Sequence, residues 1–463
     1  MRNEVIFFIN GAEHRARGDA VFQTVSRYLR YDQRATGTKI VCEEGDCGAC
    51  TVLVGRPEGG GLRYRPVNSC IQFLFQVDGT HVVTVEGLSK NGLTPLQDAM
   101  VRCHGAQCGY CTPGFIMAMA AMWEGARGSG LGAREVSAAL TGNLCRCTGY
   151  EPIIMAALEV EGQPRIDEMF PPDPILRALP DGEGVRVGSF FKPATLEEAI
   201  EFKAAHPKCV IVQGATDFGV WCNKRGFVPE AVLSLDAIEG LDEVRIEDGE
   251  LIAGGRTTLA AIEELVAGKM PELERILDRF GSPQIKNVGT LAGNIANASP
   301  IADTLPFLYV TGARLELTGR GGTRSVPIES FYRGYKTLDL RPDEIITRIR
   351  VPLPPRSDTL RLYKVSKRSH LDISSFTAAM LMRRSGDRIE SIRIAYGGVA
   401  PVILRLPKTE QFLAGRPFAL ETFEQAAPIA RDEITPISDV RGSRDFRLQL
   451  AGNVLRKFFH DAG

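Results

Sequence analysis

Cysteine spacing constrains this chain more than any other feature of its sequence. Nine of the eleven cysteines fall within the first 147 residues, and only Cys209 and Cys222 lie beyond them. An odd number of cysteines cannot all be paired in disulfides, and crowding of this kind in a reducing compartment favours metal ligation. We therefore expect the first third of the chain to fold around metal centres, whose loops must converge in space.

The first set of cysteines has the spacing Cys42-x4-Cys47-x2-Cys50, with Cys70 further along the chain. This is the spacing of plant-type 2Fe–2S ferredoxins. The glycines within the loop suit unusual backbone angles that direct amide groups at sulfur. Two alternatives are four buried thiols in an apolar core and a zinc site, although zinc sites usually show paired C-x2–4-C knuckles.

The second set consists of two pairs, each just before a predicted helix: Cys108 with Cys111, and Cys145 with Cys147. Helix N-termini present unsatisfied N–H groups and favour negative charge, which suits thiolates. Cys103 competes for this site, because Cys103-x4-Cys108-x2-Cys111 repeats the spacing of the first set. Spacing alone leaves both choices open, and the two pairs at helix starts favour the set without Cys103.

The remaining pattern divides the chain by composition. Residues 1–90 are rich in β-forming residues, residues 91–160 are helical in pattern, and the prolines within 161–184 indicate a linker. Beyond the linker, strands and helices alternate. Strands are expected over residues 5–9, 51–54, 81–85, 210–212, 315–317 and 389–396, and helices over 115–123, 133–140, 153–158, 195–205, 259–266 and 447–459.

Two stretches are suited to a phosphate-bearing ligand. Residues 212–219 form a turn of small residues directly after a predicted strand, and residues 288–303 are crowded with small and hydrogen-bonding side chains. Such backbone lets N–H groups approach a pyrophosphate closely. A strand that ends in a glycine turn is also common without any ligand. No G-x-G-x-x-G fingerprint for a nicotinamide dinucleotide stands in a strand–helix context.

Charge and hydropathy exclude several classes of partner. The chain has 55 basic and 56 acidic residues, and its net charge of −1 gives no support for a nucleic-acid or membrane-surface partner. No apolar run approaches the roughly 20 residues that span a bilayer. The N-terminal residues lack the charged leader and cleavage site of a signal peptide, so we expect a cytoplasmic protein.

The segments EEGDCGACTV, QCGYCTPG and TGNLCRCTGY resemble the tandem iron–sulfur domains of the xanthine oxidase family of molybdenum hydroxylases. The resemblance implies an α+β multidomain chain with four domains and a linker. These are a plant-type ferredoxin-like (β-grasp) domain over 1–90, a helical 2Fe–2S domain over 91–160, a linker over 161–184, a vanillyl-alcohol oxidase-type FAD domain over 185–355 and an α/β flavoprotein C-terminal domain over 356–463.

The resemblance also implies which residues hold the cofactors, and it decides the second cluster against Cys103. The implied ligands of the two 2Fe–2S clusters are Cys42, Cys47, Cys50, Cys70, Cys108, Cys111, Cys145 and Cys147. The implied FAD-binding residues are Ile211, Val212, Gln213, Gly214, Ala215, Thr216, Asp217, Phe218, Phe280, Thr290, Gly293, Asn294, Asn297, Asp303 and Ile373. No residue is expected to act as a general acid or base.

By the same resemblance, the chain is expected to relay electrons. The sequence ends at Gly463 without a molybdopterin domain, so a molybdopterin-binding large subunit is the expected partner, in an (αβ)2 heterotetramer. Electrons would pass from it through both clusters to FAD and then to NAD. The expected activity is that of a bacterial xanthine dehydrogenase, oxidising hypoxanthine and xanthine to urate. Alternatives are an aldehyde, nicotinate or aromatic acyl-CoA substrate, and a zinc-binding scaffold without redox activity.

Overall fold

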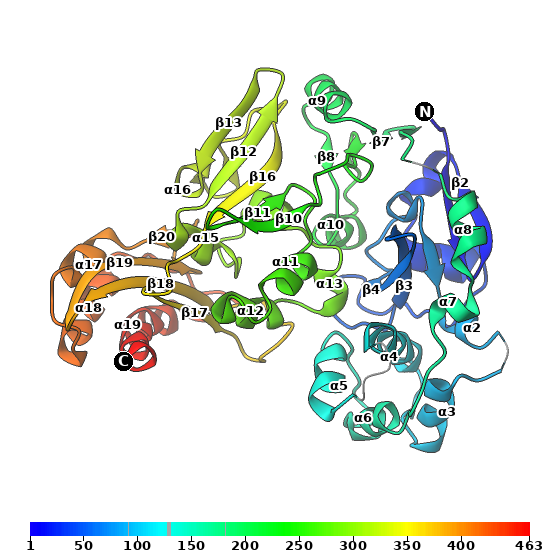
Figure 1. Ribbon diagram of the computed structural model, residues 1–463, viewed down its shortest axis with the longest axis horizontal. Helices are drawn as coiled ribbons and strands as arrows, with labels where there is room; N and C mark the ends of the chain where they lie inside the picture. Colours follow the sequence, from blue (N-terminus) through cyan, green and yellow to red (C-terminus); the bar gives the residue numbers. More distant parts are fainter. Residues whose placement is uncertain (91, 127–130, 181) are drawn as a thin grey trace. The chain divides into compact units, whose positions relative to one another are not determined.

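The computed structural model describes residues 1–90, 92–126, 131–180 and 182–463 (Figure 1). Contacts divide the chain into two compact units. Unit 1 comprises Met1–Ile238 and Ser282–Gly289, and unit 2 comprises Glu239–Gly281 and Thr290–Gly463. A short segment within the expected FAD domain therefore folds with the N-terminal part of the chain. Each unit is described by itself below.

Unit 1 begins with a five-stranded sheet in the order β2-β1-β5-β3-β4. Its strands are β1 (Val5–Ile9), β2 (Ala12–Ala16), β3 (Thr51–Glu58), β4 (Gly61–Asn68) and β5 (His81–Val83). The pair β1 and β5 is parallel, and the other neighbours are antiparallel. The strands predicted at 5–9 and 51–54 are confirmed. The strand predicted at 81–85 ends at Val83, since helix α2 (Val85–Leu88) starts just beyond it.

A group of helices follows this sheet: α3 (Pro95–Arg102), α4 (Thr112–Ala126), α5 (Ala133–Ala139) and α6 (Glu151–Leu158). Helix α4 is apolar around most of its circumference, and every residue from 114 to 120 is buried. A helix that is apolar all round belongs in a core rather than on a surface. It contacts α3 and α5, and also strands β3 and β4. The three helices predicted between residues 115 and 158 are confirmed.

The proline-rich stretch after α6 contains two short helices, α7 (Ile166–Met169) and α8 (Pro172–Ala178). Proline is tolerated in the first turn of a helix, where its missing N–H has no partner to lose. Ile166, Phe170 and Ile175 are buried in the same apolar cluster as α4. The stretch predicted as a linker is therefore packed on unit 1, with the start of α7 at Glu124 of α4 and with α8 against strand β4.

The last part of unit 1 is a four-stranded sheet in the order β6-β7-β9-β8, with α9 (Leu196–Ala205) and α10 (Phe218–Arg225). Its strands are β6 (Val185–Val187), β7 (Phe190–Lys192), β8 (Val210–Ile211) and β9 (Val232–Leu233). Strand β9 pairs in parallel with both β7 and β8. Thr195 caps α9 by accepting a hydrogen bond from Glu198 N–H, as its position before the helix predicts.

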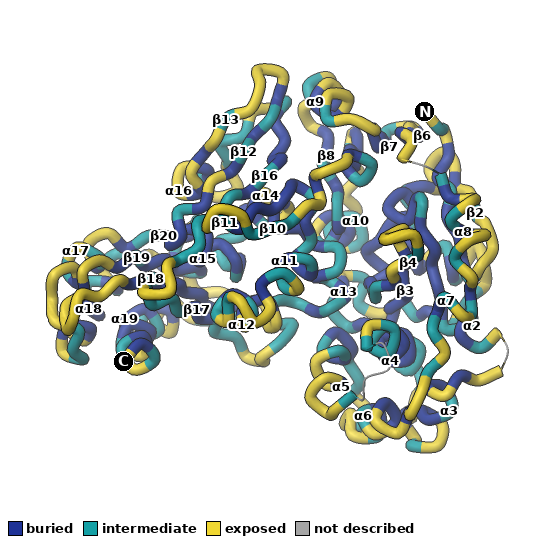
Figure 2. The backbone as a smooth tube through the Cα atoms, in the orientation of Figure 1, coloured by how far each residue is buried: buried dark blue, intermediate teal, exposed yellow. Residues whose placement is uncertain are grey.

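Unit 2 contains an antiparallel five-stranded sheet in the order β10-β11-β16-β12-β13. Its strands are β10 (Val244–Glu247), β11 (Glu250–Gly254), β12 (Arg314–Gly319), β13 (Gly322–Pro327) and β16 (Ile345–Pro352). Residues 320–323, at the tip of the β12–β13 hairpin, are exposed (Figure 2). A further antiparallel pair, β14 (Tyr332–Gly334) and β15 (Thr337–Leu338), follows this hairpin in the sequence.

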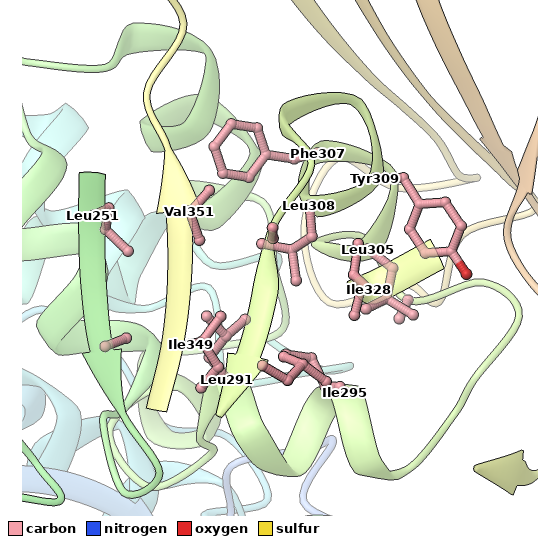
Figure 3. Close-up of a cluster of buried hydrophobic side chains, with 14 of the residues drawn as sticks. Leu251, Leu291, Ile295, Leu305, Phe307, Leu308, Tyr309, Ile328, Ile349 and Val351 are labelled. Atoms are coloured by element: carbon pink, nitrogen blue, oxygen red, sulfur yellow. The ribbon is translucent and has the colours of Figure 1, made fainter. Parts of the chain in front are cut away.

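Helices cover this sheet with apolar side chains. They are α11 (Leu259–Val266), α12 (Pro271–Asp278), α14 (Leu291–Ala296), α15 (Leu305–Thr311) and α16 (Ile328–Phe331). Figure 3 shows Leu251 of β11, Val351 of β16 and Leu308 of α15 gathered in one cluster, and all three are buried. The alternation of buried residues along β12 is the period-two pattern of a strand with one face in the core.

The C-terminal part of unit 2 is an antiparallel sheet, β17-β18-β19-β20, covered by three helices. Its strands are β17 (Thr359–Val365), β18 (Phe376–Ser385), β19 (Arg388–Gly397) and β20 (Leu404–Arg405), and its helices are α17 (Pro407–Leu413), α18 (Leu420–Asp432) and α19 (Arg444–Ala462). The strand predicted at 389–396 and the helix predicted at 447–459 are confirmed. Across the described residues, we find no helix that combines the length and apolarity needed to cross a membrane.

Candidate cofactor-binding sites

The loop that carries the first three cysteines, residues 42–50, has no helix or strand. It adopts left-handed backbone angles at Glu43 (φ +54°), Gly45 (φ +79°) and Gly48 (φ +70°). A Cβ at Gly48 would lie 2.2 Å from the carbonyl oxygen of Gly142, so only glycine fits there. The side-chain amide of Asn68 holds the loop by donating to Gly45 O at 2.8 Å.

The four thiols of this set lie near one another. Cys42 is close enough to Cys47 and Cys70, and Cys70 to Cys50, for each thiol to affect the pKa of its neighbour. Cys50 and Cys70 are buried, whereas Cys42 and Cys47 are partly exposed. The thiols of Cys47 and Cys70, together with the backbone N–H groups of Glu44 and Cys47, hold the pKa of Cys42 far below its ordinary value. The backbone N–H groups of Glu44 and Cys47 are donors of the kind that an anionic metal–sulfur centre requires.

The second set meets as two pairs, and each pair takes one cysteine from each segment. Cys108 lies close enough to Cys147, and Cys111 to Cys145, for the thiols of each pair to affect one another's pKa. The segments stand directly before α4 and α6, as predicted from the sequence. Burial raises the pKa of Cys111 to about 12, with help from Cys145. A metal that binds this thiol must therefore displace its proton.

Two neighbours shape the second segment around Cys145. The backbone N–H of Cys145 donates to the hydroxyl oxygen of Tyr150 at 3.1 Å, and its sulfur lies 3.2 Å from Thr148 Oγ1. Tyr150 has a left-handed backbone (φ +72°) just before α6. Such strain in a bulky residue is uncommon and is found where the surroundings impose it.

Cys103, the rival ligand of the second set, has a different partner. Its thiol donates to Glu159 Oε2 at 3.1 Å. Burial and this carboxylate raise the pKa of Cys103. Burial likewise raises the pKa of Cys209, and it raises that of Cys222 to about 11. These three thiols favour their protonated form, and the structure groups none of them with either four-cysteine set within the described residues.

The two cysteine segments pack directly against each other in unit 1. Leu144 N–H donates to Cys47 O at 3.0 Å, and Asn143 Nδ2 donates to Gly48 O at 3.0 Å. A Cβ at Gly114 would lie 2.3 Å from Gly48 O. The N-terminal end of α4 therefore approaches the first loop backbone to backbone, and no larger residue fits at either glycine.

The thiol arrangement fits a binuclear centre better than a single ion. Over residues 1–90, 92–126, 131–180 and 182–463, no three His, Cys, Asp or Glu side chains converge closely enough for one metal ion. A 2Fe–2S cluster instead divides four thiolates between two irons. The two pairs of the second set match such a division.

The first predicted flavin segment is a tight turn between β8 and α10. Ala215 has a left-handed backbone (φ +54°), and its carbonyl accepts a hydrogen bond from Gly219 N–H at 2.7 Å. A Cβ at Gly214 would lie 2.1 Å from Val288 O, so the turn requires glycine. The turn leads into the N-terminus of an eight-residue helix, a position that favours phosphate.

The side chains of this segment point in several directions. Val212 and Phe218 are buried in the apolar core of unit 1, so these two would contribute backbone only, whereas Ile211 is partly exposed. The Gln213 amide, oriented by its partners, donates to Asp236 Oδ1 and accepts from Leu235 N–H. Thr216 is partly exposed and Asp217 is exposed, which leaves their side chains at the surface of the turn.

The second flavin segment lies in unit 2, around helix α14. Thr290 caps this helix by accepting a hydrogen bond from Gly293 N–H at 3.0 Å. Asn294 Oδ1 accepts from the Thr304 hydroxyl at 2.6 Å, and Asn297 Oδ1 accepts from Lys336 Nζ at 2.9 Å. These predicted residues lie close together along one helix and the loop beyond it.

Asp303 makes two side-chain contacts that the sequence did not predict. Its side chain is 7% exposed and pairs with Lys364 Nζ at 2.5 Å, and its other oxygen accepts from the Ser374 hydroxyl. Ile373, next to Ser374, is 56% exposed, and Phe280 is partly buried against the core of unit 2. The role that these contacts support for Asp303 is to hold the side chains of Lys364 and Ser374 in place.

Several polar residues at these sites carry no motif, and sequence reasoning missed them. Lys364 reaches Asp303 from a strand 61 positions later in the chain. Gln72 Nε2 donates to Gly214 O at 2.7 Å, and Gln284 Nε2 donates to Asn143 Oδ1 at 2.8 Å. Only for Gln72 was there a nearby signal, since it stands two positions after Cys70.

Three families match successive parts of the chain. Residues 84–158 match the [2Fe-2S] binding domain, residues 185–354 match the FAD binding domain in molybdopterin dehydrogenase, and residues 361–462 match the CO dehydrogenase flavoprotein C-terminal domain.

Whole-chain relatives agree with these matches. Aldehyde oxidase 1 of Bos taurus is 30% identical over 99% of this chain, and xanthine dehydrogenase 1 of Arabidopsis thaliana is 28% identical over 98%. In both cases the chain spans only 39% of the relative's own length.

Solved structures match a smaller part. A chain of the Cu,Mo-CO dehydrogenase matches 58% of this chain and 95% of its own length, with 26% identity and a TM-score of 0.55. A chain of quinoline 2-oxidoreductase from Pseudomonas putida 86 matches 60% of this chain and 97% of its own length, with 27% identity and a TM-score of 0.55. Taken together, the domain matches and the relatives identify this chain as an iron–sulfur and FAD-binding member of the xanthine oxidase family of molybdenum hydroxylases.

Proposed function

We propose that this chain is the electron-transfer subunit of a xanthine dehydrogenase. Its eight predicted cysteine ligands would hold two 2Fe–2S clusters, and FAD would bind to residues of the set that the family resemblance implies. The single observation that carries the proposal is the meeting of two separate four-thiol sets in one packed region of unit 1. Two one-electron centres in a chain that also matches a flavin-binding domain suit the passage of electrons.

The cofactors would supply the redox chemistry, because a 2Fe–2S cluster carries one electron at a time whereas FAD can exchange two. The residues of this chain bind and orient them. Backbone N–H groups such as those of Glu44 and Cys47 would stabilise the anionic sulfurs, and the glycine positions let the backbone approach closely. None of the fifteen FAD-site residues is assigned a proton-transfer role.

The partner and the substrate are part of the proposal. A molybdopterin-binding large subunit would oxidise hypoxanthine and xanthine to urate, NAD would accept the electrons, and the complex would be a cytoplasmic (αβ)2 heterotetramer. The named relatives support a xanthine- or aldehyde-oxidising class, since each aligns with almost the whole chain. The CO dehydrogenase and quinoline chains align with 58% and 60% of it, so they share a smaller part of this arrangement.

Metal and flavin analysis of the purified full chain tests the proposal. We expect about four irons and one FAD per chain, with the visible charge-transfer bands of iron–sulfur clusters. Molybdenum should appear only when the partner subunit co-purifies, and xanthine should then reduce NAD. A colourless protein that contains zinc in place of iron would overturn the electron-transfer function in favour of a scaffold.

Two serine variants test the ligand assignment. Cys108→Ser removes a thiol that contacts Cys147, and we expect it to lose about half of the iron and one EPR signal. Cys103→Ser is the matched control, because Cys103 contacts Glu159 instead, and its iron content should equal that of the parent. The reverse result would show that Cys103 is the ligand.

A further inference from the structure

Three consecutive residues that include the first-cluster cysteine Cys70 lie against the flavin turn and its helix, all within unit 1. Asn223 Nδ2, on α10, donates to Cys70 O at 2.8 Å and to Glu43 O at 3.0 Å. Ile71 packs on α10 so closely that a Cβ at Gly219 would lie 2.8 Å from both Ile71 Cβ and Ile71 O. Gln72 completes the set through its hydrogen bond to Gly214 O.

These contacts are buried, so water cannot replace them. Cys70 is 2% exposed, Ile71 is fully buried and Gln72 is 3% exposed. A carbonyl that loses its only donor in such surroundings keeps its desolvation penalty, which is why buried hydrogen bonds matter more when broken than when formed. Gly214 stands directly before Ala215, whose backbone is left-handed. The orientation of the Gly214 carbonyl therefore fixes the direction of the turn.

Asn223, on helix α10, contacts the same cysteine segment through Cys70. Its amide group bridges Glu43, in the loop of Cys42, and Cys70, the distant fourth cysteine. The Asn223 side chain therefore connects α10, the helix after the flavin turn, to both parts of the first cysteine set: the loop of Cys42 and the segment of Cys70. A shift of the turn or helix must move the cysteine segment with it, because the backbones are in van der Waals contact at Gly219.

We propose that Gln72 and Asn223 are positioning residues that couple the first cluster to FAD. This inference rests on the proposed function, since it requires that both cofactors bind. Gln72 holds the flavin turn through Gly214, and Asn223 holds Cys70 against α10. FAD binding and the electronic environment of the first cluster are therefore linked, and by reciprocity the state of each site affects the other.

The test compares the parent chain with Gln72→Leu, each loaded with iron–sulfur clusters and FAD. Leucine keeps the volume and removes the donor to Gly214, so the FAD dissociation constant should rise about tenfold. In the parent, removal of FAD should change the EPR spectrum of the first cluster. In Gln72→Leu that FAD-dependent change should be lost, while the signal of the second cluster stays the same.

Thr80→Val is the matched control. Thr80 is as buried as Gln72 and also donates to a backbone carbonyl, Val77 O at 2.8 Å, but it contacts neither Gly214 nor a cysteine. It should lower stability without changing the FAD dissociation constant or the FAD-dependent EPR change. If Gln72→Leu does not fold, Asn223→Ala replaces it, since Asn223 is only partly buried, and the FAD-dependent change should again be lost.

The outcomes separate the two proposals. A parent chain without iron or FAD contradicts the proposed function itself. A parent that binds both, with variants whose FAD affinity and EPR response match it, contradicts only the coupling. A parent whose first-cluster spectrum is the same with and without FAD also overturns the coupling.

Discussion

At the scale of single residues, His81 shows how a buried titratable group sets a pH limit on the fold. It is fully buried in β5, its Nε2 accepts from Gly11 N–H at 3.0 Å, and its Nδ1 lies 2.7 Å from the Tyr64 hydroxyl. This pattern requires a neutral ring with its proton on Nδ1. Burial lowers the pKa of His81 to about 4.

The lowered pKa of His81 predicts a loss of stability in mild acid. The unfolded chain binds a proton near pH 6.5, whereas the folded chain does so only near pH 4. The stability is therefore fully present above about pH 6.5 and is lost as the pH falls toward 4. At pH 5 the expected loss is about 2 kcal/mol, measurable by denaturant unfolding at pH 7 and pH 5.

His81→Gln is the control for this pH dependence. Its amide oxygen can accept from Gly11 N–H, and it does not titrate. The difference in unfolding free energy between pH 7 and pH 5 should be about 2 kcal/mol smaller in this variant than in the parent. Equal differences in the two proteins would show that His81 is not the group responsible.

At the scale of secondary-structure elements, Asp78 ties the first sheet of unit 1 to the second. Its side chain is fully buried and accepts from Arg2 Nη2 at 2.8 Å, from Ile6 N–H at 2.9 Å and from Lys192 Nζ of β7. Burial opposes the charge, but Arg2 and Lys192 outweigh it, and the pKa of Asp78 lies below its ordinary value. Backbone bonds between Arg2 and residues 184 and 186 reinforce the junction.

Removal of the Asp78 charge should lower the free energy of unfolding. Asp78→Asn keeps the shape but leaves two cations facing a neutral amide, so we expect a loss of about 3–5 kcal/mol in the free energy of unfolding. Glu183→Gln is the control, because Glu183 is 59% exposed and lies 3.8 Å from Arg2. That change should cost under about 1 kcal/mol. Equal effects of the two substitutions would contradict the role of the buried carboxylate.

At the scale of the whole molecule, the chain does not fold as a simple series of domains. Ser282–Gly289 belongs to unit 1, although the residues on both sides of it belong to unit 2. Helix α13 (Pro283–Lys286) lies in this segment. Gln284 is fully buried there, and its Nε2 donates to Asn143 Oδ1 at 2.8 Å and to Thr51 Oγ1 at 3.2 Å. A segment from the FAD-binding family match thus completes the packing around both cysteine sets.

Gln284→Leu should therefore destabilise unit 1. The substitution removes the donor to two buried acceptors, so we expect a loss of about 1–3 kcal/mol in the free energy of unfolding. Gln449→Leu is the control, since Gln449 is exposed on α19 of unit 2 and donates only to Asn453, at 3.3 Å. Its effect should stay within about 0.5 kcal/mol. An equally small effect at Gln284 would show that the inserted segment contributes little to the cysteine region.

Much of the fold was predictable because the local signals were strong. The cysteine spacings, the proline after Thr112 and the apolar run that follows it predicted the two thiol sets and helix α4 from short stretches of chain. The helix at Leu259–Val266 was predicted with its full bounds, since its apolar residues recur at helical spacing. The helices within the proline-rich stretch were missed, because their apolar residues are buried against distant parts of the chain, among them strand β4.

The sequence by itself determined which residues are candidates for the chemistry, since ligand spacing and turn glycines are properties of short segments. Spacing alone left open whether Cys103 joins the second set, the family resemblance decided against it, and in the tertiary structure its thiol contacts Glu159. The pairing of Cys108 with Cys147, the burial of Asp303 with Lys364 and the contact of Gln72 with Gly214 were decided only by tertiary structure. Each joins residues far apart in the chain, and no local pattern records such a contact. The eight cysteines were readable from spacing and resemblance, whereas the way they meet depends on how distant segments pack.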